Sequence, residues 1–522
     1  MSERILELAR SVHQPTETHA DGEEVIEVSA PASTAASFYE KVRTVVDYQE
    51  EHLLRRNAIL RILKRFLGSD MPLEQMGKNL LRELIWAKYL PNREIPEDFV
   101  GTLNPIINKY EPLLRQIDTI GSGKDVIFSW VLDVMSTEIE YALTPPVADE
   151  ALVSYMYEEM RGRINWDTRL VIKDEDRDLR TYIAIHKILL KSNLATLRFR
   201  LMTLYYPDWP GPSTKARIKD IADNLETVIT TIDAQIQNPV TIKLAILLRR
   251  KAGLFRVMHD IVEHHPDDLP AILYDPEKFD REAAKALKKR TRNFRTRIRR
   301  TVLRAIAFLF LTKMLLALMI EVPYDLLVFE EIAALPLVVN ILFPPLLLAF
   351  IGMTIGIPEK QNTSDYTSAM RALLVGADHD LVNTRVKRET FGTWSRIFNA
   401  FYGAMFLFIY GLIAIALGLL SFHWLSVTLF LLFLSLVMFF GIRIRVSTKD
   451  IVLSTARAGI VGSLFDFFTI PIVRAGRWFS LKFSKINVFI YFFDFIIESP
   501  LKVAIRFLEG WMAFVSEKKE EL

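Results

Sequence analysis

Residues 275–323 read DPEKFDREAAKALKKRTRNFRTRIRRTVLRAIAFLFLTKMLLALMIEVP, and this stretch decides the fold. Asp275 can cap a helix and Pro276 suits a first helical turn, while no Gly or Pro follows until Pro323. Residues 281–300 are crowded with Lys and Arg, whereas residues 302–320 are almost wholly apolar. We predict one helix of about 45 residues and roughly 70 Å, of which only the last ~30 Å can lie in a bilayer core.

Composition separates a charged part of the chain from an apolar part. Of the 522 residues, 51% are hydrophobic and 24% are charged, and the apolar excess lies after Val302. The chain has no cysteine, which excludes disulfides, thiolate zinc sites and cysteine nucleophiles. The first residues, MSERILELARSVHQ, lack the apolar core of a signal peptide, so we expect later apolar segments to direct membrane insertion.

The pattern before residue 275 predicts a helical domain. Residues 1–36 are rich in Glu, Ser, Thr, Ala and Pro and are typical of a disordered tail. Ser37 and Glu40 have the spacing of a capping box, so order should begin there. Apolar residues then recur at helical spacing, while period-two alternation is scarce. We expect helices at residues 37–67, 72–90, 125–143, 149–161, 176–205, 213–237 and 240–264.

Four later segments are close to the roughly 20 apolar residues that a membrane span requires. They are residues 302–320, 332–357, 398–420 and 424–442. The connection 321–331 carries acidic residues and no Lys or Arg, whereas the connection 359–397 and the residues after 442 carry several basic ones. The positive-inside rule then predicts an integral membrane protein with two hairpins and both termini in the cytosol.

The C-terminal part is aromatic but irregular. The apolar runs 464–473 and 486–497 are too short to cross a membrane comfortably, and basic residues lie between them. Ser499 and Pro500 open a helix that carries only a narrow polar stripe. Such segments are typical of helices that lie among lipid headgroups or pack against a bundle, with a fifth span or a re-entrant loop as the alternative.

Taken together, these patterns predict an all-α protein with a cytosolic multi-helix domain, a four-span transmembrane helix bundle and C-terminal amphipathic interfacial helices. The predicted divisions are a disordered tail at 1–36, a cytosolic helical domain at 37–274, a basic helix entering the membrane at 275–301, a four-helix transmembrane region at 302–442 and an amphipathic membrane-interface region at 443–522.

Two motifs that suggest ligand sites fail on spacing. The segment 121–124, Gly-Ser-Gly-Lys, lacks the earlier Gly and the following Ser or Thr of a phosphate-binding loop. His259, Glu263 and His264 could meet on a helix, but their order is not His-Glu-x-x-His. No serine elbow, paired-acid motif or dinucleotide fingerprint is present either. We therefore predict no catalytic, cofactor or metal site, and a protein that is not an enzyme.

The basic residues beside the first span predict contact with anionic lipid headgroups. Clustered cations can also bind nucleic acid through its phosphates. Cations that adjoin a span on the side where Lys and Arg set topology favour lipid instead, each contributing about 1 kcal/mol. We predict no nucleic-acid partner. The lipid-headgroup candidates are Lys288, Lys289, Arg290, Arg292, Arg295, Arg299 and Arg300, with Arg474, Arg477 and Lys482 nearer the C-terminus.

Polar and helix-breaking residues inside the predicted spans form a candidate intramembrane site. Lys313 lies near mid-depth of the first span, where a cation is costly unless it snorkels or finds a partner. Pro344 and Pro345 in the second span remove backbone donors and free the carbonyls of Asn340 and Ile341, at a depth that Lys313 could reach. The alternatives are a kinked, well-packed hairpin and a broken helix that lines a polar cavity, as transporters use.

Small residues in two spans permit close helix packing. Gly352 and Gly356 lie four residues apart, as do Ala414 and Gly418. This spacing allows close approach within the bundle or between copies of the chain, so a homo-oligomer is one outcome.

Three functions remain open at this point. The first is a membrane-anchored scaffold whose cytosolic helical domain binds protein partners. The second is an oligomeric channel or transporter with a cytosolic regulatory domain, which rests on Lys313, Asn340 and the two prolines. A membrane-bound enzyme is third, because only scattered His and Asp residues support it.

Overall fold

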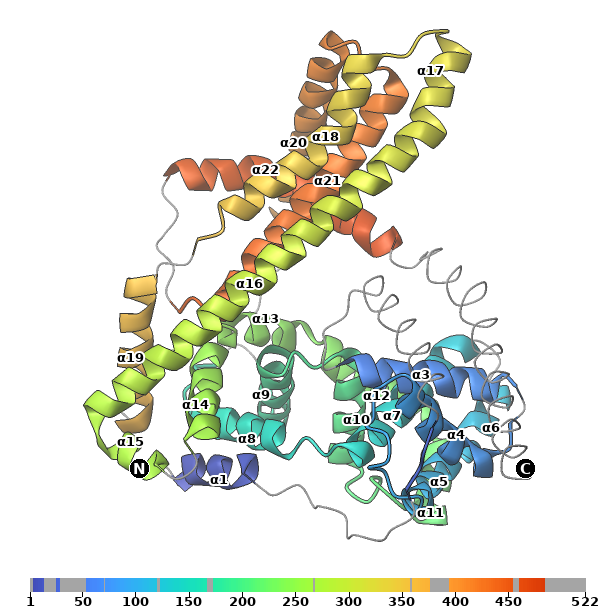
Figure 1. Cartoon of the computed structure of the whole chain (residues 1–522), viewed down its shortest axis with the longest axis vertical. Coiled ribbons are helices and arrows are strands. Elements are labelled where there is room, and N and C mark those ends of the chain that lie inside the picture. Colours follow the sequence, from blue (N-terminus) through green and yellow to red (C-terminus); the bar gives the residue numbers. More distant parts are fainter. Residues whose placement is uncertain are drawn as a thin grey trace, which may run out of the picture. The chain divides into compact units, whose positions relative to one another are not determined.

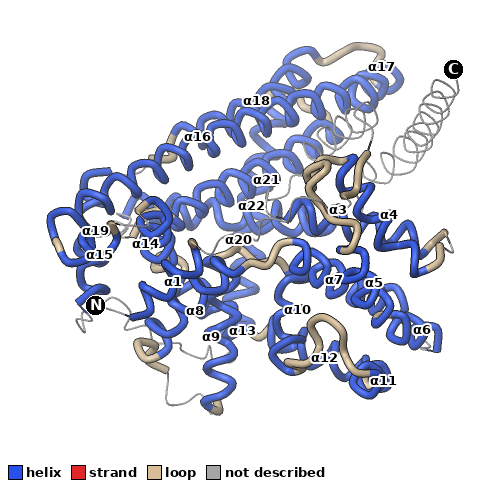
Figure 2. Tube along the Cα trace, turned by 60° about the horizontal axis from the view of Figure 1, so that its bottom comes forward, coloured by secondary structure: helices blue, strands red, loops and turns tan. Residues whose placement is uncertain are grey.

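The computed structural model describes residues 3–13, 25–28, 53–69, 71–119, 123–166, 172–265, 268–356, 359–375, 394–453 and 460–483. Among these residues the regular elements are helices, with isolated bridges such as Val25 to Pro96 (Figures 1 and 2). The all-α prediction is therefore confirmed. By its contacts the chain divides into a C-terminal unit of Met1–Leu6, Gly162–Val171 and Leu247–Ile486, and an N-terminal unit of Glu7–Arg161, Ile172–Ile246 and Asn487–Leu522.

The N-terminal unit is a set of amphipathic helices around α7 (Lys124–Leu143). The buried side chains of α7 include Trp130, Val131 and Met135, and α7 packs against α3, α5, α6, α10 and α12. The other helices are α3 (Leu54–Leu67), α4 (Leu73–Trp86), α5 (Phe99–Lys109), α6 (Glu111–Thr119), α8 (Val147–Arg161), α9 (Asp174–Leu189), α10 (Leu194–Tyr205), α11 (Lys215–Asp223) and α12 (Leu225–Gln237); α1 (Glu3–Val12) and α13 (Pro239–Leu248) cross the divisions between the units.

Three of the long helices predicted from periodicity are each two helices. Residues 176–205 break between α9 and α10, where Lys191 has a φ of 56° and Asn193 caps α10 by accepting from the Thr196 amide. Residues 213–237 break at Asn224, and residues 240–264 break between Leu248 and Ala252. Periodicity misses these breaks because apolar residues continue at helical spacing on both sides of each one.

The N-terminal unit contains a buried polar network in addition to its apolar core. The carboxylate of Glu138 pairs with Lys109 and accepts from the Tyr110 hydroxyl at 2.6 Å and from the Gly211 amide at 2.9 Å. Lys109 also donates to the Trp209 carbonyl at 2.5 Å. Because every member of this network has a partner, the charged groups can be buried between α5, α7 and the loop before α11.

The C-terminal unit contains the apolar helices. It consists of α14 (Ala252–His264), α15 (Leu269–Tyr274), α16 (Pro276–Leu316), the π-helical turn η2 (Ala317–Glu321), α17 (Val322–Val328), α18 (Ala334–Met353), α19 (Glu359–Val375), α20 (Trp394–Leu419), α21 (Trp424–Ser447), the 3₁₀ turn η3 (Thr448–Asp450) and α22 (Ile460–Phe483).

The helix predicted from residue 275 is present and is longer than expected. The Asp275 side chain accepts hydrogen bonds from the Glu277 and Lys278 amides, and the helical path then continues for 53 residues to Val328. At about 1.5 Å per residue its length is about 80 Å. The expected end at Pro323 is wrong, because the turn η2 directly before it closes with a bond from the Val322 amide to the Ala317 carbonyl, and α17 follows.

Within the described part of the chain, four helices are long and apolar enough to cross a membrane: Pro276–Val328, Ala334–Met353, Ala400–Leu419 and Trp424–Ser447. They coincide with the four predicted spans. Helix α18 runs along α16 and also packs on α21 (Figure 1). Leu309, Leu348, Phe433 and Val437 are buried where these three helices meet.

Glycine allows two of the closest helix contacts in this unit. A Cβ on Gly352 would lie 2.9 Å from Val302 Cγ1, so the small residue lets α18 approach α16. A Cβ on Gly476 would lie 1.9 Å from the Ser435 carbonyl oxygen, so α22 crosses directly against α21. Among the described residues, none lies within 4 Å of a Cβ placed on Gly356 or Gly418, so of the two predicted small-residue pairs the close contact falls on Gly352.

Helix α22 joins two segments that the sequence pattern separates. The apolar run 464–473 and the cations Arg474 and Arg477 lie on one helix of 24 residues that contains Pro471. The predicted run 486–497, the helix opened by Ser499 and the capping box at Ser37 lie outside the described residues. Of the predicted tail 1–36, residues 14–24 and 29–36 also lie outside them, whereas residues 3–12 form the helix α1, in which Ile5 and Leu8 are buried.

Candidate functional sites

A buried polar cluster lies between the apolar helices, and it contains two of the predicted intramembrane residues. Lys313 Nζ lies 3.0 Å from Glu321 Oε1, and Asn340 Nδ2 lies 2.8 Å from Glu321 Oε2. Asn340 Nδ2 also lies 3.3 Å from the Ser426 carbonyl oxygen. Lys313 and Asn340 are fully buried and Glu321 is 1% exposed. The cluster therefore places a full charge pair inside the apolar part of the unit.

Two further features define the chemistry of this cluster. Lys313 Nζ lies 4.7 Å from the centroid of the Phe433 ring, whose negative face favours a cation. Asn340 Oδ1 is buried and has no hydrogen-bond partner among the residues that the structure describes. A buried acceptor of this kind can take a hydrogen bond from a water molecule or bind a cation.

The partner of Lys313 differs from the one expected. The sequence predicts the freed carbonyls of Asn340 and Ile341 near Lys313, but the ammonium group pairs with Glu321, a residue of the predicted connection outside the membrane. Pro344 and Pro345 are buried within α18, which continues through them from Ala334 to Met353. The contacts thus bring Lys313 and Asn340 together through Glu321.

The π-helical turn explains why Glu321 can reach Lys313. On a regular α-helix a residue eight positions on lies about 80° around the axis, while one seven positions on is nearly in line. The turn η2 at Ala317–Glu321 is wider than an α-helical turn and absorbs one extra residue. Glu321 is thereby rotated toward the face that carries Lys313.

Aromatic contacts join the connections at one end of the apolar helices. Trp424 Nε1 donates to the Tyr324 hydroxyl at 2.6 Å, and the rings of Phe329 and His423 stack with centroids 3.8 Å apart. The connection between α17 and α18 and the turn between α20 and α21 therefore lie together.

At the opposite end of these helices, a group of contacts that we call the juxtamembrane junction joins the end of α21 to α14 and α19. Arg249 Nε lies 2.6 Å from Asp450 Oδ1. Asn362 donates to the Ile451 carbonyl at 3.1 Å and accepts from the Leu453 amide at 3.0 Å. The chain segment that follows the fourth apolar helix is thus bonded to the turn before α14 through Arg249 and to α19 through Asn362.

Tyr366 occupies the centre of the juxtamembrane junction. Its side chain is buried, and a Cβ on Gly253 would lie 2.1 Å from the Tyr366 hydroxyl oxygen and 3.1 Å from the Asp450 carbonyl oxygen. Burial raises the pKa of Tyr366, so the hydroxyl remains neutral. Burial also lowers the pKa of Arg256 on the same helix as Gly253, although Asp450 opposes that shift.

The charged half of α16 is also held by ion pairs. Arg290 on α16 pairs with Asp260 on α14, with Nη2 2.6 Å from Oδ1, and Arg371 on α19 pairs with Asp280, with Nε 2.7 Å from Oδ1. Lys289 Nζ lies 2.8 Å from His264 Nε2. Lys289 and Arg290, which are predicted headgroup contacts, therefore have partners within the protein.

The remaining predicted headgroup residues with described side chains are exposed. Arg474 Cζ also lies 5.1 Å from the centroid of the Tyr402 ring. The side chain of Lys482 lies outside the described part of the chain. The exposed residues are Lys288, Arg292, Arg295, Arg299, Arg300, Arg474 and Arg477.

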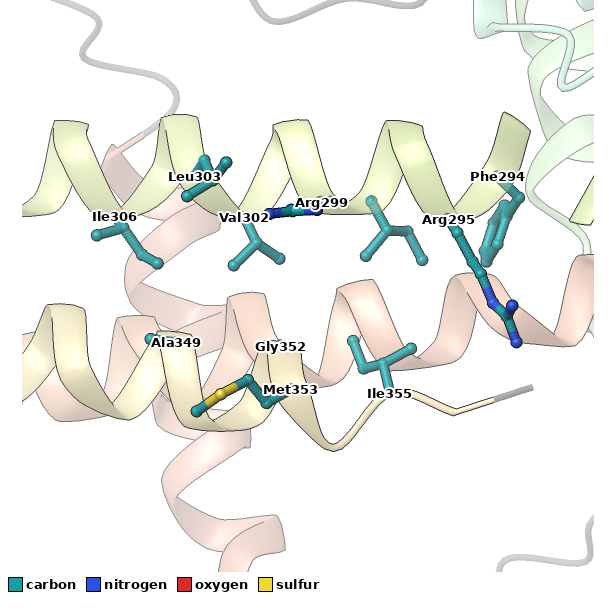
Figure 3. A pocket seen from close by; sticks show the side chains of 11 residues that line it. Phe294, Arg295, Arg299, Val302, Leu303, Ile306, Ala349, Gly352, Met353 and Ile355 are labelled. Atoms are coloured by element: carbon teal, nitrogen blue, oxygen red, sulfur yellow. The ribbon is translucent and has the colours of Figure 1, made fainter. Parts of the chain in front are cut away.

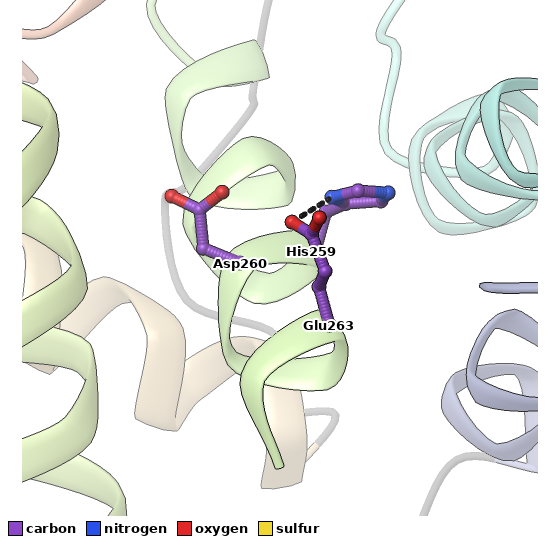
Figure 4. Close-up of side chains that lie close together, drawn as sticks. All are labelled: His259, Asp260 and Glu263. Carbon is purple, nitrogen blue, oxygen red and sulfur yellow. Dashed lines mark ion pairs between the residues drawn. The ribbon is translucent and has the colours of Figure 1, made fainter. Parts of the chain in front are cut away.

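His259, Asp260 and Glu263 on α14 lie close enough to be compared with a metal site (Figure 4). His259 Nδ1 lies 3.9 Å from Glu263 Oε2, but the carboxylate of Asp260 is bound by Arg290. His264 contacts Lys289, and His265 Nε2 lies 3.1 Å from Glu282 Oε2. These contacts engage the groups that a metal ion would need, so we assign no metal to them.

A second buried titratable cluster lies in the N-terminal unit, where α8, α9 and α10 carry Glu150, His186 and Arg200. Arg200 pairs with Glu150, and His186 Nε2 lies 3.8 Å from Glu150 Oε2. Burial raises the pKa of Glu150 to about 7, although Arg200 opposes this shift. Burial, together with the charge of Arg200, lowers the pKa of the fully buried His186 to about 3.

Comparisons of the chain with protein-family models, with curated proteins and with solved structures each return no match.

Proposed function

We propose that this protein is a membrane-anchored scaffold, in which four apolar helices hold a cytosolic helical part that binds protein partners. The observation that carries the proposal is the unbroken helical path Pro276–Val328, which is basic in one half and apolar in the other. Because only about 30 Å of its ~80 Å can lie in a bilayer core, the basic half must stand outside.

The contacts of the basic half of α16 favour a rigid support over a flexible tether. Arg290 and Arg371 tie it to α14 and α19 through Asp260 and Asp280, and the juxtamembrane junction ties the end of α21 to the same helices. Helices α14 and α19, joined to α16 by such contacts, keep a defined orientation relative to it, and a fixed surface of this kind favours the assembly of partners on it.

The orientation follows from charge. The connection 321–331 is acidic, whereas the residues that surround the other ends of the apolar helices are basic. The positive-inside rule places the basic ends, and with them both termini, in the cytosol.

The scaffold proposal is tested by two measurements on the full-length protein. Chemical cross-linking in intact cells, followed by purification, should recover a partner in a fixed ratio to the protein. Proteoliposomes that contain the purified protein should release trapped ions and small solutes no faster than empty vesicles. Solute-selective flux without a partner of fixed ratio would contradict the proposal.

A channel or transporter is the second candidate, and the buried cluster of Lys313, Glu321 and Asn340 favours it. Ionisable residues inside membrane helices are costly and often mark ion or proton pathways. The unpartnered Asn340 Oδ1 adds an acceptor in the same place. Four spans are few for a monomeric transporter, so this function requires an oligomer.

A flux measurement on a variant of Lys313 distinguishes the two candidate functions. If the chain transports a solute, Lys313→Met should abolish the flux while leaving the protein in the membrane. If the cluster only stabilises the bundle, no flux is present to lose, and the variant should change stability alone.

A further inference from the structure

A groove of about 380 Å³ lies between α16 and α18 where the basic half of α16 meets the apolar half (Figure 3). Its size falls within the range of about 300–1,000 Å³ that is typical of ligand sites. Both helices belong to the C-terminal unit. The residues that line it on α16 include Arg295, Arg299, Leu303 and Ile306, and those at the end of α18 include Ala349 and Met353.

The groove is charged at one end and apolar along the rest. Arg295 and Arg299 are both exposed, and a guanidinium group presents a planar set of donors that matches phosphate oxygens. Leu303 is 57% exposed and Met353 is 78% exposed, so the apolar wall is open on one side. A ligand that fits both ends must carry an anionic group and a hydrocarbon chain.

The level of the groove relative to the predicted bilayer indicates the kind of ligand. Val302 begins the apolar half of α16, and Arg299 and Arg295 precede it by about 5 and 10 Å along the helix axis. In the predicted orientation these guanidinium groups lie at the level of the cytosolic headgroups, and Leu303 and Ile306 lie at the level of the first acyl carbons.

We propose that this groove binds one molecule of an anionic glycerophospholipid. Its phosphate lies between Arg295 and Arg299, and one acyl chain lies along Leu303, Ile306 and Ala349. The proposal rests on the membrane position that the proposed function also requires. A lipid is favoured over a protein helix because the charged end and the apolar wall match the two parts of a lipid at the depth where a bilayer supplies both.

The charged end is tested by native mass spectrometry of the full-length protein in a neutral detergent. With phosphatidylglycerol added, the unmodified protein should retain one lipid molecule, and it should bind phosphatidylcholine at least tenfold more weakly. Arg295→Gln with Arg299→Gln should weaken phosphatidylglycerol binding about tenfold or more, because charge-assisted bonds to phosphate are lost.

A matched control uses two other arginines of the same helix. Arg297 and Arg304 are exposed and lie on the side of α16 away from the groove lining. Arg297→Gln with Arg304→Gln removes the same charge and should change the binding less than twofold. If both pairs weaken binding equally, the attraction is a general property of the basic helix and the proposed site is wrong.

The apolar end is tested by filling the groove without changing its charge. Ala349→Leu and Leu303→Trp each add volume to the wall, and each should weaken phosphatidylglycerol binding at least fivefold. Two variants are used so that the test survives if one fails to fold, as judged by size-exclusion elution. Unchanged binding in a folded filled variant would show that no acyl chain occupies the groove.

The membrane position is checked on the same protein by extraction of membranes with alkaline carbonate. Protein that resists extraction but retains no phosphatidylglycerol would overturn the lipid site alone. Protein that is released by carbonate would overturn the membrane position, and with it the proposed function.

Discussion

Lys313 and Glu321 place two opposite charges inside a region lined by apolar side chains. Removing such a pair from water is costly, and their mutual attraction only partly offsets that cost. The amide of Asn340 and the ring of Phe433 supply the remaining favourable contacts. Each of the two charges is therefore tolerated in this apolar region only while its partner is present.

Lys313→Met alone should destabilise the C-terminal unit by about 3–5 kcal/mol, because Glu321 remains buried without its countercharge. Adding Glu321→Gln should recover much of this loss. The measurement is the apparent Tm in detergent, with Lys360→Met as a control because Lys360 is exposed. Equal losses in the single and double variants would show that the two charges do not interact.

Glu150 and His186 predict opposite pH effects on the N-terminal unit. The pKa of His186 is lowered from 6.5 to about 3, so the folded state loses stability as the pH falls through this interval. The pKa of Glu150 is raised from 4.5 to about 7, so the folded state loses stability as the pH rises from 4.5 to about 7. Between about pH 4.5 and 6.5, where the two intervals overlap, the two effects on the free energy of unfolding oppose each other.

Single variants should separate these slopes. Glu150→Gln should leave a stability that rises between about pH 4.5 and 6.5, by up to about 1.4 kcal/mol per pH unit. His186→Phe should leave one that falls over the same interval. Urea unfolding followed by tryptophan fluorescence measures both, and parallel pH profiles in the two variants would show that burial does not shift these groups.

At the scale of elements, the helix from Pro276 to Val328 links the charged and apolar parts of the C-terminal unit. Residues between Ala283 and Ile320 include no Gly or Pro, and Ala, Leu, Lys and Arg are good helix formers. A continuous helix transmits a tilt or rotation from one part to the other, whereas a hinge would absorb it.

Replacing Arg299-Arg300 with Gly-Gly should lower local helix stability by about 1 kcal/mol per Gly. Both halves should still fold, since Arg299 and Arg300 are exposed and neither side chain packs in a core, but partner binding or flux that needs both halves should fall. Partner recovery or flux by the variant at unchanged expression measures the effect. Full activity of the variant would show that the two halves need no rigid connection.

Contact between α21 and α22 depends on a single glycine. Gly476→Ala should destabilise the unit by about 1–3 kcal/mol, because the added Cβ would meet the Ser435 carbonyl. Gly411→Ala on α20 is the matched control, since nothing lies within 4 Å of its Cβ position. Apparent Tm values in detergent compare the two, and equal values would contradict this packing.

Local chemistry made part of this fold predictable from sequence. The cap at Asp275, the end of α3 before Gly68 and the four apolar spans depend on neighbouring residues or on run length, so they were found. Glu321 was misplaced because its position depends on the π-helical turn η2, which periodicity does not show. Periodicity also misses the break before Asn193, because apolar residues continue at helical spacing on both sides of it.

Tertiary packing decides the rest of the candidate sites. A count of cations could not separate Arg290, which binds Asp260, from Arg299, which lines the groove. The groove itself depends on how α16 and α18 are rotated against each other, and the juxtamembrane junction joins residues about 200 positions apart, such as Arg249 and Asp450. Neither arrangement leaves a pattern in the sequence.

At the scale of the whole molecule, the four apolar helices form two hairpins, which are the basis of the proposed membrane topology. The aromatic contacts of Tyr324 with Trp424 and of Phe329 with His423 join the two hairpin tips, and the ion pairs of Arg249 and Arg371 lie at the other ends of the helices. If both hairpins cross a bilayer, this arrangement puts the residues before α16 and those after α21 on the same side of it.

The most direct test of the central claim is the accessibility of single cysteines, which the cysteine-free chain allows without background. Leu327→Cys and Leu419→Cys, both on exposed positions near the hairpin tips, should react with a membrane-impermeant maleimide in intact cells. Lys288→Cys and Lys360→Cys should react only after the membrane is opened. Reaction of Lys288→Cys in intact cells, or protection of Leu327→Cys there, would contradict four spans with cytosolic termini.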